Sequence, residues 1–417
     1  MSKLQKQQQT ATESQSPIAA AAVERSEYTR RRSWRELLRT DLGVLPVLLT
    51  LLVIVLFFEV TTNGLFLTPR NLSDLAQQIA EIGIAGLGGI LVLLLGEIDL
   101  SVASVALLAA VIMAVCSERL NYPAWASISI ALTAAAVVGA INGILVAVIR
   151  IPSFIVTLAG SIAYAGLLLY LMFGQTTLII RSDFILAIAG SPQSFLPDSL
   201  GIGLPVLAVA LYVAGLLFGQ AKRRRLGLRT QPLAQVILQI VVTVVLVGAV
   251  VVAFESYHGI PYSTALLFGL ILIFWLILTK TGFGRHVYAV GGNMEAARRA
   301  GINVVGIRIA VFTLCSLLAA VAGIVEASRN TAVYSAVSPT LLLDAIGAAV
   351  IGGVSLFGGR GSAWAIVLGM LIIGALENGL TLQSQGTDIK NMVEGAVLII
   401  AVIADALIRR AQTRAGR

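Results

Sequence analysis

Apolar runs about as long as a membrane-spanning helix recur along almost the whole chain. Crossing the hydrocarbon core in a helix takes about 20 predominantly apolar residues. Only 12% of the residues are charged, whereas soluble domains contain about 25%. We therefore predict an all-α, polytopic membrane protein with about twelve transmembrane helices. The runs place these helices at residues 42–60, 75–95, 100–117, 124–149, 154–173, 201–219, 234–254, 262–279, 307–328, 341–356, 362–380 and 391–408.

The third and tenth of these helices begin at aspartates, Asp99 and Asp344. A charged side chain inside a membrane is costly, and irregular backbone is tolerated there only where the protein buries it or lines a cavity with it. We therefore expect these two helices to be broken or re-entrant.

The distribution of Lys and Arg predicts the orientation of the helices. With twelve spans and the N-terminus inside, 24 of the 29 Lys and Arg residues fall on the cytoplasmic side, as the positive-inside rule requires. Both termini are therefore expected in the cytoplasm. The net charge of +8 then reflects this topology and a basic face toward anionic lipid. The lipid bilayer is an expected partner and nucleic acid is not.

By composition the chain divides into three parts. Residues 1–41 are basic and Gln-rich, which is typical of a disordered segment, and we expect a cytoplasmic tail there. No small-residue cleavage site follows a short apolar core, so no signal peptide is predicted. Residues 42–408 are expected to form the transmembrane domain, and residues 409–417 a second cytoplasmic tail.

Two stretches of the chain echo each other. The first reads I-D-L-S-V-A-S-V from Ile98 and G-A-I-N-G-I-L from Gly139. The second reads L-D-A-I-G-A-A-V from Leu343 and G-A-L-E-N-G-L from Gly374. In the predicted topology the leading helix of the first unit runs outward and that of the second runs inward. This predicts an inverted repeat with a pathway between the two halves; chance pairing of small-residue motifs is the alternative.

The predicted helix pair between residues 201 and 254 matches nothing in the other half. Its helices are joined by the basic stretch K-R-R-R-L-G-L-R from Lys222. We interpret the pair as an insertion at the periphery of the bundle, with the arginines as a cytoplasmic anchor.

The stretch from Gly282 to Gly301 reads G-F-G-R-H-V-Y-A-V-G-G-N-M-E-A-A-R-R-A-G. It is a charged, glycine-punctuated loop that the topology places in the cytoplasm. Such a loop has little reason to contain a short amphipathic helix unless something docks there. Glu295, Arg298 and Arg299 would supply the charged face of that helix; a solvated connector is the alternative.

The E-A-A-x-x-x-G pattern from Glu295 to Gly301 resembles the coupling loop of ABC importer permeases, which sits in a groove of an ATPase subunit. Four further features are similar to the permease subunits of bacterial monosaccharide ABC importers, in the branch that includes ribose and xylose transporters. They are G-E-I-D-L-S-V from Gly96, P-S-F-I-V-T-L-A-G from Pro152, L-D-A-I-G-A-A-V-I-G-G-V-S-L-F-G-G-R-G from Leu343, and Asn-Gly at Asn142 and Asn378.

The resemblance covers roughly residues 42–408, with the motifs in the family's order. The inserted helix pair and the stretch I-P-S-F-I-V-T-L-A-G look most like the permeases for D-xylose. One departure is Ala103, where the family usually has glycine. This exchange weakens the transfer of residue roles to the start of the third helix.

The resemblance implies a ten-helix importer core with an inverted repeat, to which the helix pair is added. It implies import of a monosaccharide, D-xylose first, across the bacterial inner membrane by alternating access. The expected partners are a cytoplasmic ABC ATPase, a periplasmic sugar-binding protein and a second permease copy in a homodimer. ATP and Mg would bind to the ATPase. Because this chain has no G-x-x-x-x-G-K-[ST] pattern, we expect neither ATP hydrolysis nor a bound cofactor here.

The coupling loop is expected at about residues 281–306. The residues expected to serve ATPase coupling are Tyr288, Gly292, Asn293, Met294, Glu295, Ala296, Ala297, Arg298 and Gly301. Polar residues in a membrane are usually functional, and the candidates for a sugar pathway are Asp99, Ser101, Asn142, Ser153, Thr157, Asp344 and Asn378. The candidates for hinges are Gly352, Gly353, Gly358 and Gly359, on either side of residues 354–357.

Each of these candidates also has a structural interpretation. Asp99 and Asp344 can accept hydrogen bonds from backbone groups at the starts of their helices. The Asn, Ser and Thr side chains can satisfy broken backbone, and the glycines can serve close helix packing.

An ion-coupled secondary transporter is the main alternative from another class, with Asp99 or Asp344 binding a proton or sodium ion. Ribose, another monosaccharide or a furanose-like signal molecule is the alternative substrate within the importer class. A membrane-embedded enzyme is disfavoured because no Ser-His, His-Glu-x-x-His or paired catalytic carboxylates occur. His258 and His286 are single histidines in loops, so we expect no catalytic residue and no metal site.

Overall fold

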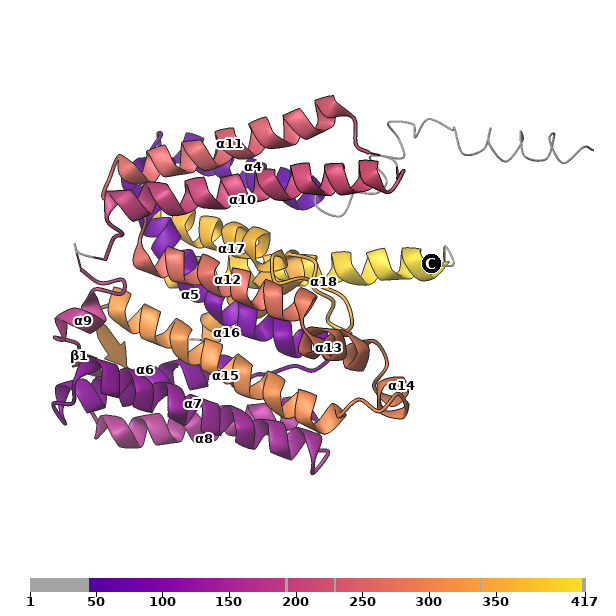
Figure 1. Cartoon of the computed structure of the whole chain (residues 1–417). Coiled ribbons are helices and arrows are strands. Elements are labelled where there is room, and N and C mark those ends of the chain that lie inside the picture. The colour runs from indigo at the N-terminus through magenta and orange to yellow at the C-terminus, as the bar shows by residue number, and fades with distance from the viewer. Residues whose placement is uncertain (1–44, 192–193, 229, 338, 415–417) are drawn as a thin grey trace, which may run out of the picture. The chain divides into compact units, whose positions relative to one another are not determined.

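The structure of the chain, a computed structural model, describes residues 45–191, 194–228, 230–337 and 339–414 (Figure 1). It divides into two units, residues 1–49 and 50–417. Only the first five residues of one helix are described in the first unit. The predicted tail at residues 1–41 and the last three residues of the tail at 409–417 lie outside the described residues.

The second unit is built almost entirely of helices. A short antiparallel pair of strands joins the segment after α8 to the segment after α15, with Thr177 opposite Tyr334 and Ile179 opposite Ala332. The elements are α4 (Leu45–Thr61), α5 (Pro69–Leu94), α6 (Val102–Glu118), α7 (Ala124–Ala147), α8 (Ser153–Met172), β1 (Thr177–Ile179), α9 (Asp183–Leu186), α10 (Asp198–Arg225), α11 (Leu233–Glu255), α12 (Tyr262–Lys280), α13 (Gly282–Gly292), α14 (Met294–Arg299), α15 (Val304–Arg329), β2 (Ala332–Tyr334), α16 (Pro339–Ile351), α17 (Ala365–Leu382) and α18 (Thr387–Arg414).

Each predicted span coincides with one of these helices. Within the described residues, eight helices are long and apolar enough to cross a membrane, namely α5, α7, α8, α10, α11, α12, α15 and α17. Three shorter apolar helices, α4, α6 and α16, accompany them. The prediction of an all-α, polytopic membrane protein is confirmed.

Helix α6 begins just after Asp99, whereas α16 begins at Pro339 and contains Asp344, so the prediction that the tenth helix begins at Asp344 was wrong. Both helices are short. Helix α6 has 17 residues and α16 has 13, which correspond to about 25 Å and about 20 Å at 1.5 Å per residue. Both are shorter than the hydrocarbon core of about 30 Å. The predicted span at 341–356 was too long, because α16 ends at Ile351 and Gly353 then takes a φ of 97° outside the helical region.

Helix α5 is the central element of the bundle. It packs against α11, α12, α15, α16 and α17, and 94% of its most apolar window is buried. It begins earlier than the predicted residue 75. Pro69 occupies the first turn, and the Thr68 hydroxyl accepts a hydrogen bond from the Asn71 amide. Proline and a threonine cap are typical of a helix start.

Small residues bring α15 close to its neighbours. A Cβ atom at Gly323 would lie 2.0 Å from the Ala106 carbonyl oxygen on α6, and one at Gly139 on α7 would lie 2.7 Å from the Phe312 carbonyl oxygen on α15. Any larger residue would force these backbones apart. This supports close packing of small residues as the role of these glycines.

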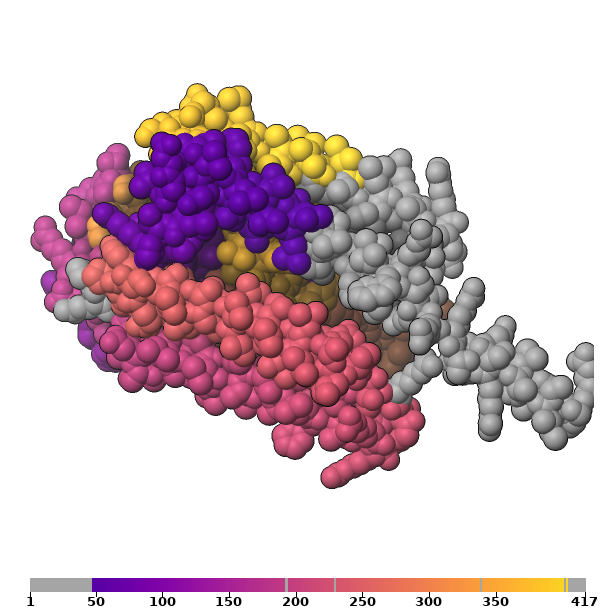
Figure 2. All heavy atoms as spheres, turned by 90° about the horizontal axis from the view of Figure 1, so that it is seen from above, coloured from indigo at the N-terminus to yellow at the C-terminus, as the bar shows by residue number. Residues whose placement is uncertain are grey.

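Helices α10 and α11 form a hairpin at the surface of the second unit. They pack along each other, and α11 also contacts α5. Figure 2 shows the hairpin as magenta and salmon spheres along one face. Only 6% of the most apolar window of each helix is buried, which is the exposure expected of helices that face lipid.

Candidate functional site

The carboxyl group of Asp99 begins a chain of hydrogen bonds through three elements. Asp99 follows α5, and its Oδ1 accepts hydrogen bonds from the Ser101 backbone amide at 2.8 Å and from the Ser101 hydroxyl at 2.6 Å. The side-chain amide of Asn142 on α7 donates to the same hydroxyl at 3.3 Å. The phenol of Tyr164 on α8 donates to Asn142 Oδ1 at 2.7 Å. All but Tyr164 are buried.

The start of α8 supplies partners for the same loop. The Thr157 hydroxyl accepts a hydrogen bond from the Leu100 amide at 3.0 Å, and the Ser153 hydroxyl accepts one from the Ile98 amide at 3.4 Å. Backbone at membrane depth must find such partners inside the protein. Five of the predicted pathway residues therefore meet here, and they bond to one another and to broken backbone.

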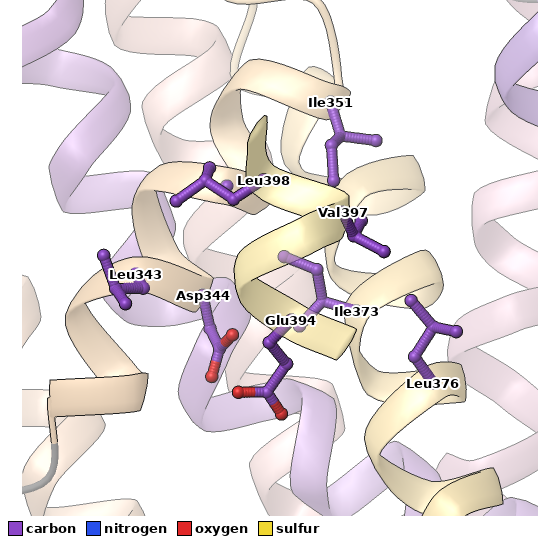
Figure 3. Close-up of a pocket in the computed structure, with 9 residues that line it drawn as sticks. Leu343, Asp344, Ile351, Ile373, Leu376, Glu394, Val397 and Leu398 are labelled. Atoms are coloured by element: carbon purple, nitrogen blue, oxygen red, sulfur yellow. The ribbon is translucent and has the colours of Figure 1, made fainter. Parts of the chain in front are cut away.

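Asp344 lies in a different environment, at the meeting of α16, α17 and α18. Its carboxyl group, that of Glu377 on α17 and that of Glu394 on α18 each offer an oxygen within 4.8 Å of the other two. Figure 3 shows the carboxyl groups of Asp344 and Glu394 close to each other in a small pocket whose other side chains are aliphatic. We call these three residues the carboxylate triad.

Asn378 does not join Asp344. Its Oδ1 accepts a hydrogen bond from the Asn71 side-chain amide on α5 at 2.9 Å, and that amide also donates to the Phe66 carbonyl oxygen. The seven predicted pathway residues thus occupy three places rather than one. The two Asn-Gly motifs also differ, because Asn142 bonds to Ser101 beside α6 whereas Asn378 bonds to Asn71 on the central helix.

A buried ion pair lies between the central helix and the end of α15. Arg329 donates to Glu81 Oε1 at 3.0 Å; the Glu81 side chain is 11% exposed and that of Arg329 is 30% exposed, so the burial is mainly on the Glu81 side. The negative charge of Glu81 repels a negative charge on Asp344. The charges of Glu326 and Glu377 in turn repel that of Glu81. The carboxylate triad is therefore part of a larger acidic region in which Arg329 is already paired.

The predicted coupling loop contains two helices, α13 and α14. The Asn293 side chain caps α14 by accepting a hydrogen bond from the Ala296 amide at 2.9 Å. Gly301 has a φ of 82°, which lets the chain turn after α14, because this region favours glycine. Glu295 contacts Arg298 at 3.5 Å and Arg299 at 3.1 Å.

The two faces of α14 differ. Glu295, Ala296, Arg298 and Arg299 are exposed, whereas Ala297 is buried in the hydrophobic core. Met294 is half-buried against that core. Helix α14 therefore rests on the bundle with its apolar side and presents a charged side outward.

Tyr288, predicted to contact a partner, is half-buried on α13 and its phenol donates a hydrogen bond to the Gly361 carbonyl oxygen at 2.9 Å. Burial raises the pKa of this phenol, so it stays protonated and remains a donor. It joins the coupling loop to the loop between α16 and α17, where the hinge candidates lie.

Backbone from three segments meets at this loop. The Gly359 amide donates to the Leu94 carbonyl oxygen at the end of α5 at 2.9 Å. A Cβ atom at Gly291, near the end of α13, would lie 1.7 Å from that same oxygen, and one at Gly358 would lie 2.8 Å from the Gly96 amide nitrogen. We call this meeting of Gly96, Gly291, Gly358 and Gly359 the glycine junction.

The remaining two hinge candidates lie just after α16. Gly353 has a φ of 97°, whereas a Cβ atom at Gly352 would lie 1.9 Å from the Ala365 carbonyl oxygen. Gly352 is thus held against the start of α17. The conformational freedom of glycine is needed at Gly353, Gly358 and Gly359, all with positive φ.

A second buried ion pair lies between the coupling loop and the Asp99 loop. Arg308, near the start of α15, pairs with Glu97, and their side chains are 13% and 12% exposed. Both residues line a cavity of about 330 Å³, together with Arg150, Met294 and Arg298. The cavity therefore extends from the Asp99 loop to α14.

Comparison with known proteins identifies the class of this protein. Residues 71–402 match the family described as "Branched-chain amino acid transport system / permease component". The chain belongs to this permease family. The prediction of a permease from the coupling-loop motif and the repeat motifs is confirmed, and with its apolar helices this permease is a multi-pass inner-membrane protein.

Several curated relatives of this permease cover nearly its full length. The Xylose transport system permease protein XylH of Escherichia coli (strain K12) is 37% identical over 89% of this chain and 93% of its own. The protein of the same name from Haemophilus influenzae is 35% identical over 88% and 96%. The Ribose import permease protein RbsC of Escherichia coli (strain K12) is 30% identical over 86% and 92%. These relatives are transport permeases and not enzymes. No solved structure matches the chain significantly.

Sequence reasoning did not single out several of the residues at these sites. Glu377 had a visible signal, because it interrupts the repeated motif, which reads G-A-I-N-G in the first half and G-A-L-E-N-G in the second. Glu394 is a carboxylate inside a predicted span, which is also unusual. Tyr164 and the Glu97–Arg308 pair had no such signal, because their partners are far away in the sequence.

Proposed function

We propose that this permease is the transmembrane subunit of an ATP-binding-cassette importer that moves a monosaccharide, D-xylose first, across the bacterial inner membrane. The observation that carries the substrate class is the similarity to xylose permeases over 89% of this chain and 93% of the relative. The relative for ribose is less similar, at 30% identity. Ribose or another monosaccharide is therefore the alternative substrate of the same importer.

The energy for transport comes from a partner. Membership in the family implies a cytoplasmic ATPase and a periplasmic sugar-binding protein, and ATP with Mg binds on the ATPase rather than on this chain. Helix α14 is the docking element, supported by its exposed Glu295, Arg298 and Arg299 and by its caps at Asn293 and Gly301. One coupling loop per chain and two ATPase sites favour a homodimer of permeases.

The orientation places both termini and the coupling loop in the cytoplasm, as the excess of Lys and Arg requires. The Glu97–Arg308 pair and the glycine junction then lie on the inner side, and the carboxylate triad lies on the outer side. ATP-driven closure of the ATPase draws the coupling loops together, and the two repeat units rock around a pathway between them. The hinge glycines allow the loop between α16 and α17 to follow this motion.

The decisive test is uptake of labelled D-xylose into proteoliposomes that contain this permease, its ATPase and its binding protein, with ATP inside. Uptake should require all three proteins and ATP, and should be reduced by unlabelled D-xylose more than by ribose. ATP-dependent uptake of another sugar alone would remove the xylose assignment and leave the importer. Uptake that ignores ATP and stops when an ion gradient is collapsed would establish the secondary transporter instead.

A further inference from the structure

The three carboxyl groups of the triad come together without partners. Asp344 is 4% exposed, and among the described residues none of Asp344, Glu377 and Glu394 receives a hydrogen bond or ion pair at its carboxyl group. Asp344 and Glu394 line a small pocket whose other lining residues are Leu343, Ile351, Ile373, Leu376, Val397 and Leu398 around Gly347. Buried charges are normally paired or coordinate a metal. The carboxyl groups therefore lack a positively charged partner.

The neighbouring cations compensate the triad only in part, because Lys390 acts favourably on the charge of Glu394 but forms no ion pair with the triad among the described residues. The Lys390 ammonium, one turn before Glu394 on α18, donates to the Thr381 hydroxyl at 2.9 Å. Arg329 is paired with Glu81 at 3.0 Å. The charges of Glu81, Glu377 and Glu394 all act unfavourably on a charge at Asp344. The region therefore has more buried negative charge than its positively charged groups balance.

We propose that the carboxylate triad binds a calcium ion. Calcium prefers carboxylate oxygens at about 2.3–2.6 Å, so an ion between two such oxygens spans about 4.8 Å. The triad offers one oxygen from each of three helices within 4.8 Å of one another. The pocket has room for about one water-sized particle. Figure 3 shows the carboxyl groups of Asp344 and Glu394 near each other, as shared ligands would be.

Calcium suits the site better than magnesium. Magnesium requires oxygens at about 2.0–2.1 Å in near-ideal octahedral geometry and releases its water reluctantly. Two such bonds span at most about 4.2 Å, so magnesium places a tighter demand on the positions of the three helices than calcium does. Calcium accepts irregular geometry, and the second carboxylate oxygens or water complete its coordination.

A calcium ion at this place would join three helices that belong to the second half of the permease. Helix α16 packs against α17 and α18, and the ion would neutralise the repulsion between them. The site would thus hold the C-terminal helices together, whichever sugar the permease carries. The proposal of a calcium site therefore rests on the geometry of the triad and not on the proposed substrate.

The test is calcium binding by the full-length permease in lipid nanodiscs after removal of bound metal with a chelator. Binding of radioactive calcium should reach one ion per chain, and about 1 mM calcium, in the range of extracellular sites, should raise the melting temperature. Magnesium and sodium at the same concentration should raise it much less. Asp344→Asn and Glu394→Gln should each weaken binding by at least about tenfold.

The control is Asp388→Asn, which changes an exposed carboxylate on the same helix as Glu394 and outside the triad. It should bind calcium as the wild type does. If Asp344→Asn does not fold, Glu394→Gln and Glu377→Gln provide the same comparison. Two results would overturn the proposal. One is equal binding by wild type and triad variants. The other is no calcium binding by the wild type; a higher melting temperature of Asp344→Asn in a chelator would then indicate that the carboxyl groups share protons.

Discussion

Arg308 and Glu97 form a buried ion pair that joins the helix after the coupling loop to the loop before Asp99. The coupling loop ends at the start of α15, where Arg308 lies, and the Asp99 loop connects the central helix to α6. A displacement of α14 therefore has a direct route to the short helix α6. The pair is a positioning element in the proposed transport cycle.

Removing one member of this pair should destabilise the permease. Glu97→Gln leaves the Arg308 guanidinium buried without a counter-charge, and we expect a loss of about 3 kcal/mol in unfolding free energy. The double variant Glu97→Gln/Arg308→Met removes both charges and should regain most of that loss. Thermal unfolding in nanodiscs measures both effects.

The double variant also tests the transmission of motion. Because it is stable but has no ion pair, it should move less sugar per ATP hydrolysed than the wild type in proteoliposomes. A wild-type ratio in the double variant would show that the pair serves stability alone.

Changes in α14 should weaken docking of the ATPase and thereby reduce transport. Glu295→Ala removes the carboxylate that orients Arg298 and Arg299, and Gly301→Ala strains a φ of 82° by about 1–2 kcal/mol. Each should weaken binding of the ATPase by at least about tenfold, which corresponds to about 1.4 kcal/mol. Co-purification and uptake measure the effect.

The matched control is His286→Ala, an exposed residue of α13 in the same loop. Its uptake should equal that of the wild type, and all three variants should melt within a few degrees of it. Normal uptake by both Glu295→Ala and Gly301→Ala would refute docking through α14.

The glycine junction offers a pair of adjacent residues with opposite expected effects. A Cβ atom at Gly291 would lie 1.7 Å from the Leu94 carbonyl oxygen, whereas one at Gly292 meets nothing within 4 Å. Gly291→Ala should therefore lower the unfolding free energy by about 2–3 kcal/mol through overpacking. Gly292→Ala should change it by less than about 0.5 kcal/mol. Equal melting temperatures would mean that the three segments are not in contact in the membrane.

The helices were predictable from the sequence because apolar runs of the right length leave few alternatives in a membrane. Their ends were harder to predict. Helix α16 stops at Ile351, although the stretch that follows, up to Phe357, contains only one polar residue, Ser355. The signal was present in Gly352 and Gly353, but the same glycines also fit the interior of a closely packed membrane helix.

The sequence showed which polar residues were candidates for the sites. It did not show which of them contact one another. Glu97 and Arg308 are separated by 211 positions, and Asn71 and Asn378 by 307. Such pairs depend on how the helices pack, and a single sequence contains no signal for it. Asp99 and Asp344 looked equivalent in the repeat motif, yet Asp99 bonds to Ser101 and Asp344 to no described residue. The repeated motif therefore predicted two similar positions and could not show their different surroundings.

The roles of Asp99 as a helix cap and as a sugar contact can be separated with two substitutions. Asp99→Ala removes the acceptor for the Ser101 amide and hydroxyl, which are 2.8 Å and 2.6 Å from Oδ1, and should cost about 2 kcal/mol of stability. Asp99→Asn keeps an oxygen at that place and should retain most of the stability. Because a cap needs the acceptor and not the charge, Asp99→Asn should also keep the wild-type sugar concentration for half-maximal uptake in proteoliposomes. A stable Asp99→Asn variant with a several-fold higher concentration for half-maximal uptake would instead place the carboxylate in the pathway.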